Sequence, residues 1–129
     1  MHAAVARAGR VELETVDDPV PAAGQVLVEP IACGLCGSDL HLLETQAAMP
    51  DLMPAMTLGH EFVGRVLDYG PDTERRLPVG SVVPSVPYLD TAVGPQLIGL
   101  SLLAPGALAE RMVLQERRLL PVPPTVPPH

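Results

Sequence analysis

The sequence contains no lysine and no tryptophan, and the absence of lysine shapes its charge. All eight basic side chains are arginines, and fifteen acidic side chains outweigh them to give a formal net charge of −7. Nucleic acids are bound by clustered basic residues, whereas the only adjacent basic pairs here are Arg75-Arg76 and Arg117-Arg118. We therefore expect these pairs to be solvated and exclude nucleic acid as a partner.

Long apolar runs are also missing. No stretch approaches the roughly 18 apolar residues of a membrane span, and residues 1–16 alternate polar and apolar side chains without the apolar core of a signal peptide. The two cysteines, Cys33 and Cys36, lie too close together for the disulfide framework of a secreted protein. These absences predict a cytoplasmic protein that has no membrane partner.

Aromatic residues are limited to one Phe and two Tyr, so the core has to be built from Val, Leu, Ala and Met. A chain of 129 residues suits a single domain with a core of its own. Sixteen prolines and eleven glycines interrupt the chain too often for long helices. The composition therefore predicts a β-rich, loop-rich domain.

The hydrophobic pattern predicts about seven short strands and one short helix, as in a small β-barrel or sandwich. The expected strands cover residues 3–7, 10–16, 25–32, 60–69, 81–86, 107–114 and 119–122. The first two form a hairpin about Ala8-Gly9, and Gly64 predicts a bulge or a close backbone contact. The remaining segments are a helix over 38–44, a methionine-rich loop over 46–57 that packs on the core, an unpatterned stretch over 89–106 and a linker over 121–128.

Two stretches hold most of the residues that could carry chemistry. They are Cys33-Gly-Leu-Cys36-Gly-Ser38-Asp39-Leu-His41 and Gly59-His60-Glu61. A catalytic zinc takes three Cys, His or carboxylate ligands and leaves a fourth position open. Cys36 and His60 are the candidate ligands if the strands beside them pair. Taken alone, these two residues are also compatible with a buried thiol and a hydrogen-bonded histidine.

The same residues admit other interpretations. A Cys-x-x-Cys motif between a strand and a helix is typical of a dithiol redox protein, but the chain offers too few long helices for that fold. Ser38 and His41 share one face of a helix and could move a proton, or could be only an N-cap and a surface histidine. Asp39 and Glu61 could orient metal ligands, or could simply cap the helix and be solvated.

Both stretches resemble the paired signatures of the zinc-dependent medium-chain alcohol dehydrogenases. The resemblance rests on Cys36-Gly-Ser-Asp-Leu-His41 and Gly59-His-Glu-Phe-Val-Gly-Arg-Val66, and it extends in order from residue 1 to about residue 126. It implies that residues 1–129 form a GroES-like catalytic domain. Such a domain is mainly β, a partly open β-barrel with one or two short helices.

The resemblance also implies roles for the residues of the metal site. Cys36 and His60 would be ligands of a catalytic Zn2+, with Glu61 beside them as a neighbouring or alternate ligand. Asp39 would hold the histidine ligand in orientation. Cys33 has no family role and is expected to contribute packing.

On the same resemblance, Ser38 would accept the proton of a substrate hydroxyl and His41 would relay that proton outward. The zinc would act as a Lewis acid on a small-molecule alcohol, polyol or carbonyl substrate, while NAD or NADP would carry the hydride. Related enzymes are commonly dimers or tetramers, so a homo-oligomer is expected.

Departures from the family pattern limit what this chain can do alone. Gly80-Ser81-Val82-Val83 stands where the family has Gly-Asp-Arg-Val, and residues 84–106 lack the four cysteines that hold a structural zinc in many members. The chain has no Gly-x-Gly-x-x-Gly and no βαβ series, so it carries no dinucleotide site. The family's third zinc ligand would also fall beyond it. We expect a truncated domain, inactive alone, whose Rossmann domain of roughly 100–200 residues lies outside this chain.

Two other functions remain open at this stage. One is a free-standing GroES-like module that binds a metal or a partner without catalysis, and the less favoured one is the dithiol redox protein. Quinone reductases share the fold but as a family lack the zinc ligands, so Cys36 and His60 argue against that branch.

Overall fold

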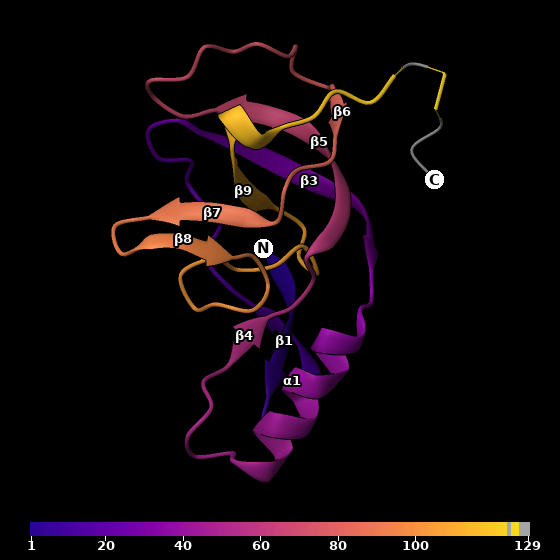
Figure 1. The fold of residues 1–129 in the computed structure, drawn as a ribbon, viewed down its shortest axis with the longest axis vertical. Coiled ribbons are helices and arrows are strands. Elements are labelled where there is room, and N and C mark those ends of the chain that lie inside the picture. Colours follow the sequence, from indigo (N-terminus) through magenta and orange to yellow (C-terminus); the bar gives the residue numbers. More distant parts are fainter. Residues whose placement is uncertain (124, 127–129) are drawn as a thin grey trace.

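In a computed structural model, which describes residues 1–123 and 125–126, short strands dominate and one α-helix projects away from most of them (Figure 1). Along the chain the elements are β1 (His2–Arg7), β2 (Arg10–Thr15), β3 (Gln25–Gly34), α1 (Gly37–Ala48), β4 (Met56–Thr57), β5 (Glu61–Tyr69), β6 (Val82–Val83), β7 (Tyr88–Thr91), β8 (Gly94–Leu97), β9 (Met112–Gln115) and the 3-10 turn η1 (Glu116–Arg118). The predicted linker at 121–128 lies partly outside the described residues.

The strands form three sheets that stay open in the described part of the chain. Their strand orders are β2-β1-β4, β6-β5-β3-β9 and β7-β8. The second sheet carries most of the core, because its central strands bury Val26, Val28 and Val66 completely. The mainly β, partly open architecture expected from the sequence is confirmed, and so is a core built mostly from aliphatic residues.

Two predicted backbone features are confirmed by the pairing of the strands. β1 and β2 form the expected hairpin, and its turn residues Ala8 and Gly9 have φ values of 49° and 78°. Positive φ at both positions matches the right-handed twist of the strands. In β5, a Cβ at Gly64 would overlap the Val28 side chain and the Glu29 carbonyl, so glycine allows the close approach of β3.

Several boundaries differ from the sequence-based expectation. α1 runs to Ala48 and so takes in the first residues of the expected methionine-rich loop, and its N-cap is Cys36 rather than Ser38. The unpatterned stretch contains the β7–β8 hairpin, which the sequence analysis missed. Residues 119–122 form no strand; there, the N–H of Leu120 donates to the Pro84 carbonyl at 3.0 Å. The expected strands at 81–86 and 107–114 shorten to β6 and β9.

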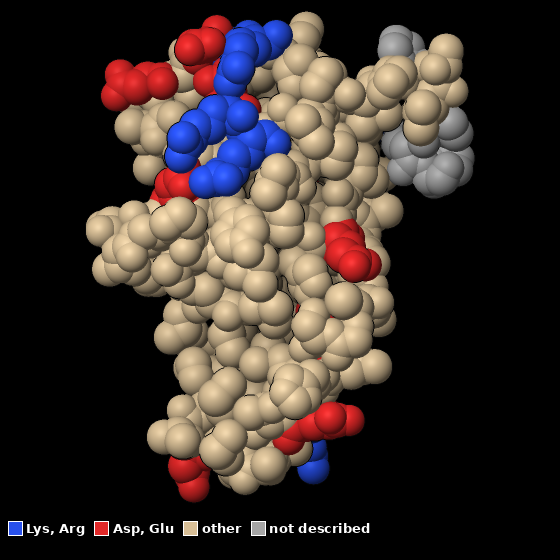
Figure 2. Space-filling view, in the orientation of Figure 1, with Lys and Arg blue, Asp and Glu red and all other residues tan. Residues whose placement is uncertain are grey.

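Charged side chains lie mainly toward the two ends of the molecule in the view of Figure 2. Arginine and acidic side chains mix at the upper end, where Figure 1 shows the yellow turn η1. There Asp90 accepts hydrogen bonds from both Arg117 and Arg118, which ties the β7–β8 hairpin to η1. Among the described residues, no helix has the length and apolar character needed to cross a membrane.

Candidate metal centre

The pairing of β3 with β5 brings the two sequence stretches together. The strands are antiparallel, and Gly34 at the end of β3 lies opposite Glu61 at the start of β5. The chain leaves β3 and enters α1 at Cys36, while it enters β5 directly after His60. One end of a single strand pair therefore presents both candidate ligands, although they are 24 positions apart in the sequence.

Three side chains from these stretches offer metal donors to one point. One donor atom each from Cys36, His60 and Glu61 lies within 4.8 Å of the other two. A thiolate, an imidazole and a carboxylate form a donor set that zinc prefers. Cys36 and His60 are half-buried and Glu61 is exposed, so the centre has one solvent-facing side. These residues fit a zinc ion.

Glu61, which the family resemblance gives as a neighbouring or alternate ligand, is the third donor of this group. The third ligand was expected beyond residue 129, whereas the geometry offers a third donor within the described chain. A Cβ at Gly34 would lie 2.9 Å from Oε2 of Glu61, so the glycine leaves room for this carboxylate. The register of β3 against β5 sets this contact, and no local sequence signal reports it.

Asp39 lies close to both candidate ligands, Cys36 and His60. Its side chain is buried, with a relative exposure of 1%. Oδ2 accepts the N–H of Cys36 at 2.8 Å, and Oδ1 lies 3.6 Å from Nδ1 of His60. Oδ1 of Asp39 and Nδ1 of His60 are both buried without a hydrogen-bond partner in the described part of the chain. The carboxylate therefore faces Nδ1 and leaves Nε2 of His60 directed at the donor cluster.

Ser38 joins the cluster, whereas His41 does not. The Ser38 hydroxyl lies 3.2 Å from Nε2 of His60. The His41 side chain is 81% exposed, and its Nδ1 lies 3.9 Å from a carboxylate oxygen of Glu44. Within residues 1–123 and 125–126, no hydrogen bond joins His41 to Ser38. The structure thus places the two proposed proton-transfer residues on one helix without direct contact.

Cys33 is a free, half-buried thiol close to the donor group of Cys36, His60 and Glu61. Burial raises the pKa of Cys33, the Asp39 carboxylate raises it further, and a backbone hydrogen bond from Glu61 opposes the rise. A dithiol redox pair needs its reactive cysteine at a helix N-terminus. Here the first cysteine lies within β3, opposite Phe62, and only Cys36 is at the helix start. This placement does not favour the redox interpretation.

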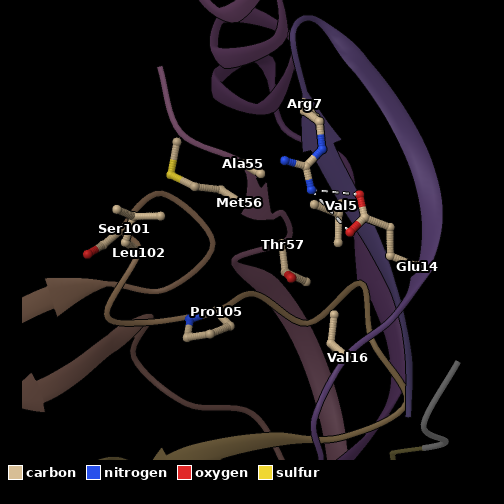
Figure 3. Close-up of a pocket in the computed structure, with 10 residues that line it drawn as sticks. All are labelled: Val5, Arg7, Glu14, Val16, Ala55, Met56, Thr57, Ser101, Leu102 and Pro105. Atoms are coloured by element: carbon tan, nitrogen blue, oxygen red, sulfur yellow. Dashed lines mark hydrogen bonds and ion pairs between the residues drawn. The ribbon is translucent and has the colours of Figure 1, made fainter. Parts of the chain in front are cut away.

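The cavities that the structure describes lie away from the donor cluster. One, of about 240 Å³, lies between β1, β2, β4 and the loop before Pro105, with the Arg7–Glu14 ion pair on one side (Figure 3). Met56 contributes to its wall, and the Met56 side chain is otherwise buried, as expected for a loop that packs on the core. None of the four described cavities is lined by Cys36, His60 or Glu61.

Comparison with known proteins shows the family to which this domain belongs. Residues 22–124 match the family model of the alcohol dehydrogenase GroES-like domain. An L-threonine 3-dehydrogenase of Xanthomonas campestris pv. campestris (strain B100) is 31% identical over 127 residues, which cover 89% of this chain and 37% of that protein. The L-threonine 3-dehydrogenase of Pyrococcus abyssi is 42% identical over 64 residues, which cover 49% of this chain and 18% of that protein.

Solved structures share the fold over nearly the whole chain. A protein of Sinorhizobium meliloti 1021 assigned as a zinc-binding dehydrogenase, bound to NADP, has a TM-score of 0.80 and 27% identity, covering 98% of this chain and 40% of its own. Acetophenone reductase of Geotrichum candidum, in complex with NAD, has a TM-score of 0.82 and 26% identity, covering 98% of this chain and 41% of its own. The chain thus spans about two fifths of the length of such relatives. It belongs to the zinc-type medium-chain alcohol dehydrogenase family, of which it carries the GroES-like domain.

Proposed function

We propose that this chain is the catalytic domain of a zinc-dependent oxidoreductase that interconverts an alcohol or polyol with its carbonyl compound. The observation that carries the proposal is the convergence of Cys36, His60 and Glu61, whose donor atoms lie within 4.8 Å of one another. These three residues would hold Zn2+ at one end of the β3–β5 pair, on the side where Glu61 is exposed to solvent. A bound zinc would supply Lewis-acid polarisation of the substrate oxygen.

The chain's own residues would then prepare the substrate for hydride transfer. Ser38, whose hydroxyl already lies beside Nε2 of His60 at 3.2 Å, is placed to accept the proton of a substrate hydroxyl. His41 lies one helical turn further along α1 on the same face and is open to solvent, so it is placed to release that proton through a bridging group. Asp39 holds the imidazole of His60 in position.

The hydride carrier would bind outside this chain. The relatives are more than twice as long as the region matched, and two of the similar structures hold NADP or NAD. A Rossmann domain elsewhere in the complete protein would supply NAD or NADP. In that arrangement residues 1–129 form the truncated catalytic part, and the whole protein is a cytoplasmic homo-oligomer.

The metal content of ligand variants tests this proposal. Cys36→Ser and His60→Ala should each lower the zinc bound per chain to near zero and abolish NAD(P)-dependent oxidation of alcohols by the complete protein. His2→Ala, an exposed histidine at the N-terminus, is the matched control and should retain full zinc content. Unchanged zinc content in both ligand variants would overturn the assignment. Zinc binding without any dehydrogenase activity in the complete protein would favour a metal-binding module instead.

A further inference from the structure

Cys33 lies beside the candidate metal centre, yet the proposed function gives it no task. We propose, as an inference that rests on the proposed metal centre, that Cys33 is a positioning residue whose sulfur fixes the backbone of residues 59–61. Two metal donors, His60 and Glu61, project from this short segment. The sulfur would act on the metal only through them.

The first contact lies on the N-terminal side of His60. Gly59 has a φ of +99°, which L side chains rarely adopt. A Cβ at Gly59 would lie 2.7 Å from the Cys33 sulfur and 3.0 Å from the backbone nitrogen of Leu108. The distance to the sulfur is shorter than a Cβ contact allows and the distance to Leu108 is tight, so the sulfur occupies the space of the missing side chain. The Cys33 sulfur therefore limits the backbone positions open to Gly59, and through Gly59 it limits the position of His60.

The second contact lies on the C-terminal side of His60. The backbone of Gly34, the residue after Cys33, pairs with Glu61, and the Cys33 thiol donates a hydrogen bond to the Gly34 carbonyl oxygen at 3.4 Å. Cys33 also packs against the hydrophobic core, and its backbone pairs with Phe62 of β5. The thiol thus lies against Gly59 on one side of His60, while the pairing of β3 with β5 fixes the backbone on the other side. Residues held in this way limit the positions that a metal ligand can take.

Cys33 differs in this respect from Cys36. The donor group that converges on one point contains Cys36, His60 and Glu61 and does not contain Cys33. The two cysteines therefore have separate roles, with Cys36 as a ligand and Cys33 as a support. The separation predicts that one thiolate, not two, binds the metal.

Titration with Co2+, a spectroscopic substitute for zinc, tests the proposal on the purified metal-free protein. The wild type should show a near-ultraviolet thiolate-to-cobalt band of one-thiolate intensity, and Cys36→Ser should lose it. Cys33→Ala should keep that band but bind Co2+ on the order of tenfold more weakly, with shifted visible bands. Cys33→Ser keeps a hydrogen-bond acceptor and should lie closer to the wild type. Leu114→Val, a core variant beside the opposite end of β3 from Cys33, should lower the melting temperature and leave the Co2+ affinity unchanged.

Two results would overturn the proposed role of Cys33. If Cys33→Ala keeps the wild-type affinity and visible bands, the sulfur contributes only packing. If Cys33→Ser instead halves the thiolate band of a wild type that shows two-thiolate intensity, Cys33 is itself a ligand. A wild type that shows no thiolate band at all would overturn the metal centre, and the role of Cys33 with it.

Discussion

A single buried carboxylate, that of Asp39, links both sides of the metal centre. It accepts the backbone N–H of Cys36 at 2.8 Å and lies 3.6 Å from Nδ1 of His60. A carboxylate facing Nδ1 favours the tautomer whose proton is on that nitrogen, so the lone pair of Nε2 stays free for a metal. The same side chain thus accepts a hydrogen bond at the helix start and lies beside the histidine.

Asp39→Asn separates these two tasks. The amide oxygen can still accept the N–H of Cys36, but the negative charge beside the imidazole is lost. We expect zinc affinity to fall by about 10- to 100-fold, while the melting temperature of the metal-free protein changes little. Competition with a chelator measures the affinity. An unchanged zinc affinity would show that His60 needs no charged partner.

Gly59 and Gly94 form a matched pair for measuring the contact with Cys33. Their φ values are +99° and +103°, but a Cβ at Gly94 would meet nothing within 4 Å. Alanine at either position carries the same backbone strain of about 1–3 kcal/mol. Gly59→Ala should be more destabilising than Gly94→Ala, because its Cβ would collide with the Cys33 sulfur and crowd Leu108, and Gly59→Ala combined with Cys33→Ala measures the share due to the sulfur. Urea denaturation compares the two variants, and equal losses would mean that the sulfur moves aside freely.

Among the elements, the β7–β8 hairpin is held to η1 by ion pairs. It lies where many family members have a cysteine-bound structural zinc, and residues 84–106 contain no cysteine. Asp90 in β7 accepts hydrogen bonds from Arg117 and Arg118, and Arg118 binds it at 2.7 Å. These hydrogen bonds lower the pKa of Asp90. Two arginines on η1 thus anchor the hairpin.

The lowered pKa of Asp90 gives this anchor a defined pH range. A carboxyl whose pKa is lower in the folded state adds stability above its unfolded pKa of about 4 and loses it as the pH falls further. Asp90→Asn should therefore destabilise the protein at pH 7, by no more than about 1 kcal/mol because the pair is partly exposed. The difference from the wild type should shrink steadily as the pH falls below about 4, through the lowered pKa of Asp90. Asp51→Asn, at an exposed loop position, should have no effect at either pH.

The helix α1 is attached to the sheets at both of its ends. Near its C-terminal end the buried Gln46 donates from Nε2 to the carbonyl oxygens of Ala6 and Pro54, at 3.1 and 2.7 Å. Near its start, Asp39 is the other buried residue. The sequence predicted a shorter helix because Met49, Pro50 and Met53 suggested a loop. The hydrogen bonds that Gln46 donates reach β1 and the loop that follows the helix, and no local sequence pattern predicts them.

For the whole molecule, local patterns predicted the β-rich class, the N-terminal hairpin and the two strands beside the candidate ligands, but not that these strands pair. Alternation in residues 60–69 and the turn at Ala8-Gly9 are local signals, and both are confirmed. The β7–β8 hairpin was not predicted, because Asp90 and Gln96 interrupt the apolar alternation in its strands. Local patterns did not predict the position of Glu61 next to the other two donors, because that position depends on the register of β3 against β5. Long-range contacts, rather than residue preferences, account for these misses.

The complete protein should be larger than this chain. The relatives are more than twice as long as the matched region, and a dehydrogenase needs a domain for its hydride carrier. Detection with an antibody in source cells, followed by intact mass spectrometry, should give a mass well above the 13.6 kDa of these residues. A native species of 13.6 kDa would contradict the dehydrogenase assignment and favour the metal-binding module.

The convergence of Cys36 and His60 has a consequence for how the chain is tied together. A metal bound by both would act as a reversible cross-link. It would close a loop of the chain that contains α1 and the residues between α1 and His60. Closing such a loop reduces the conformational entropy of the unfolded chain, as a disulfide does. Zinc removal should therefore loosen α1 before the sheets open. Amide hydrogen exchange should show this as faster exchange in residues 37–48, with the β3–β5 pair still protected.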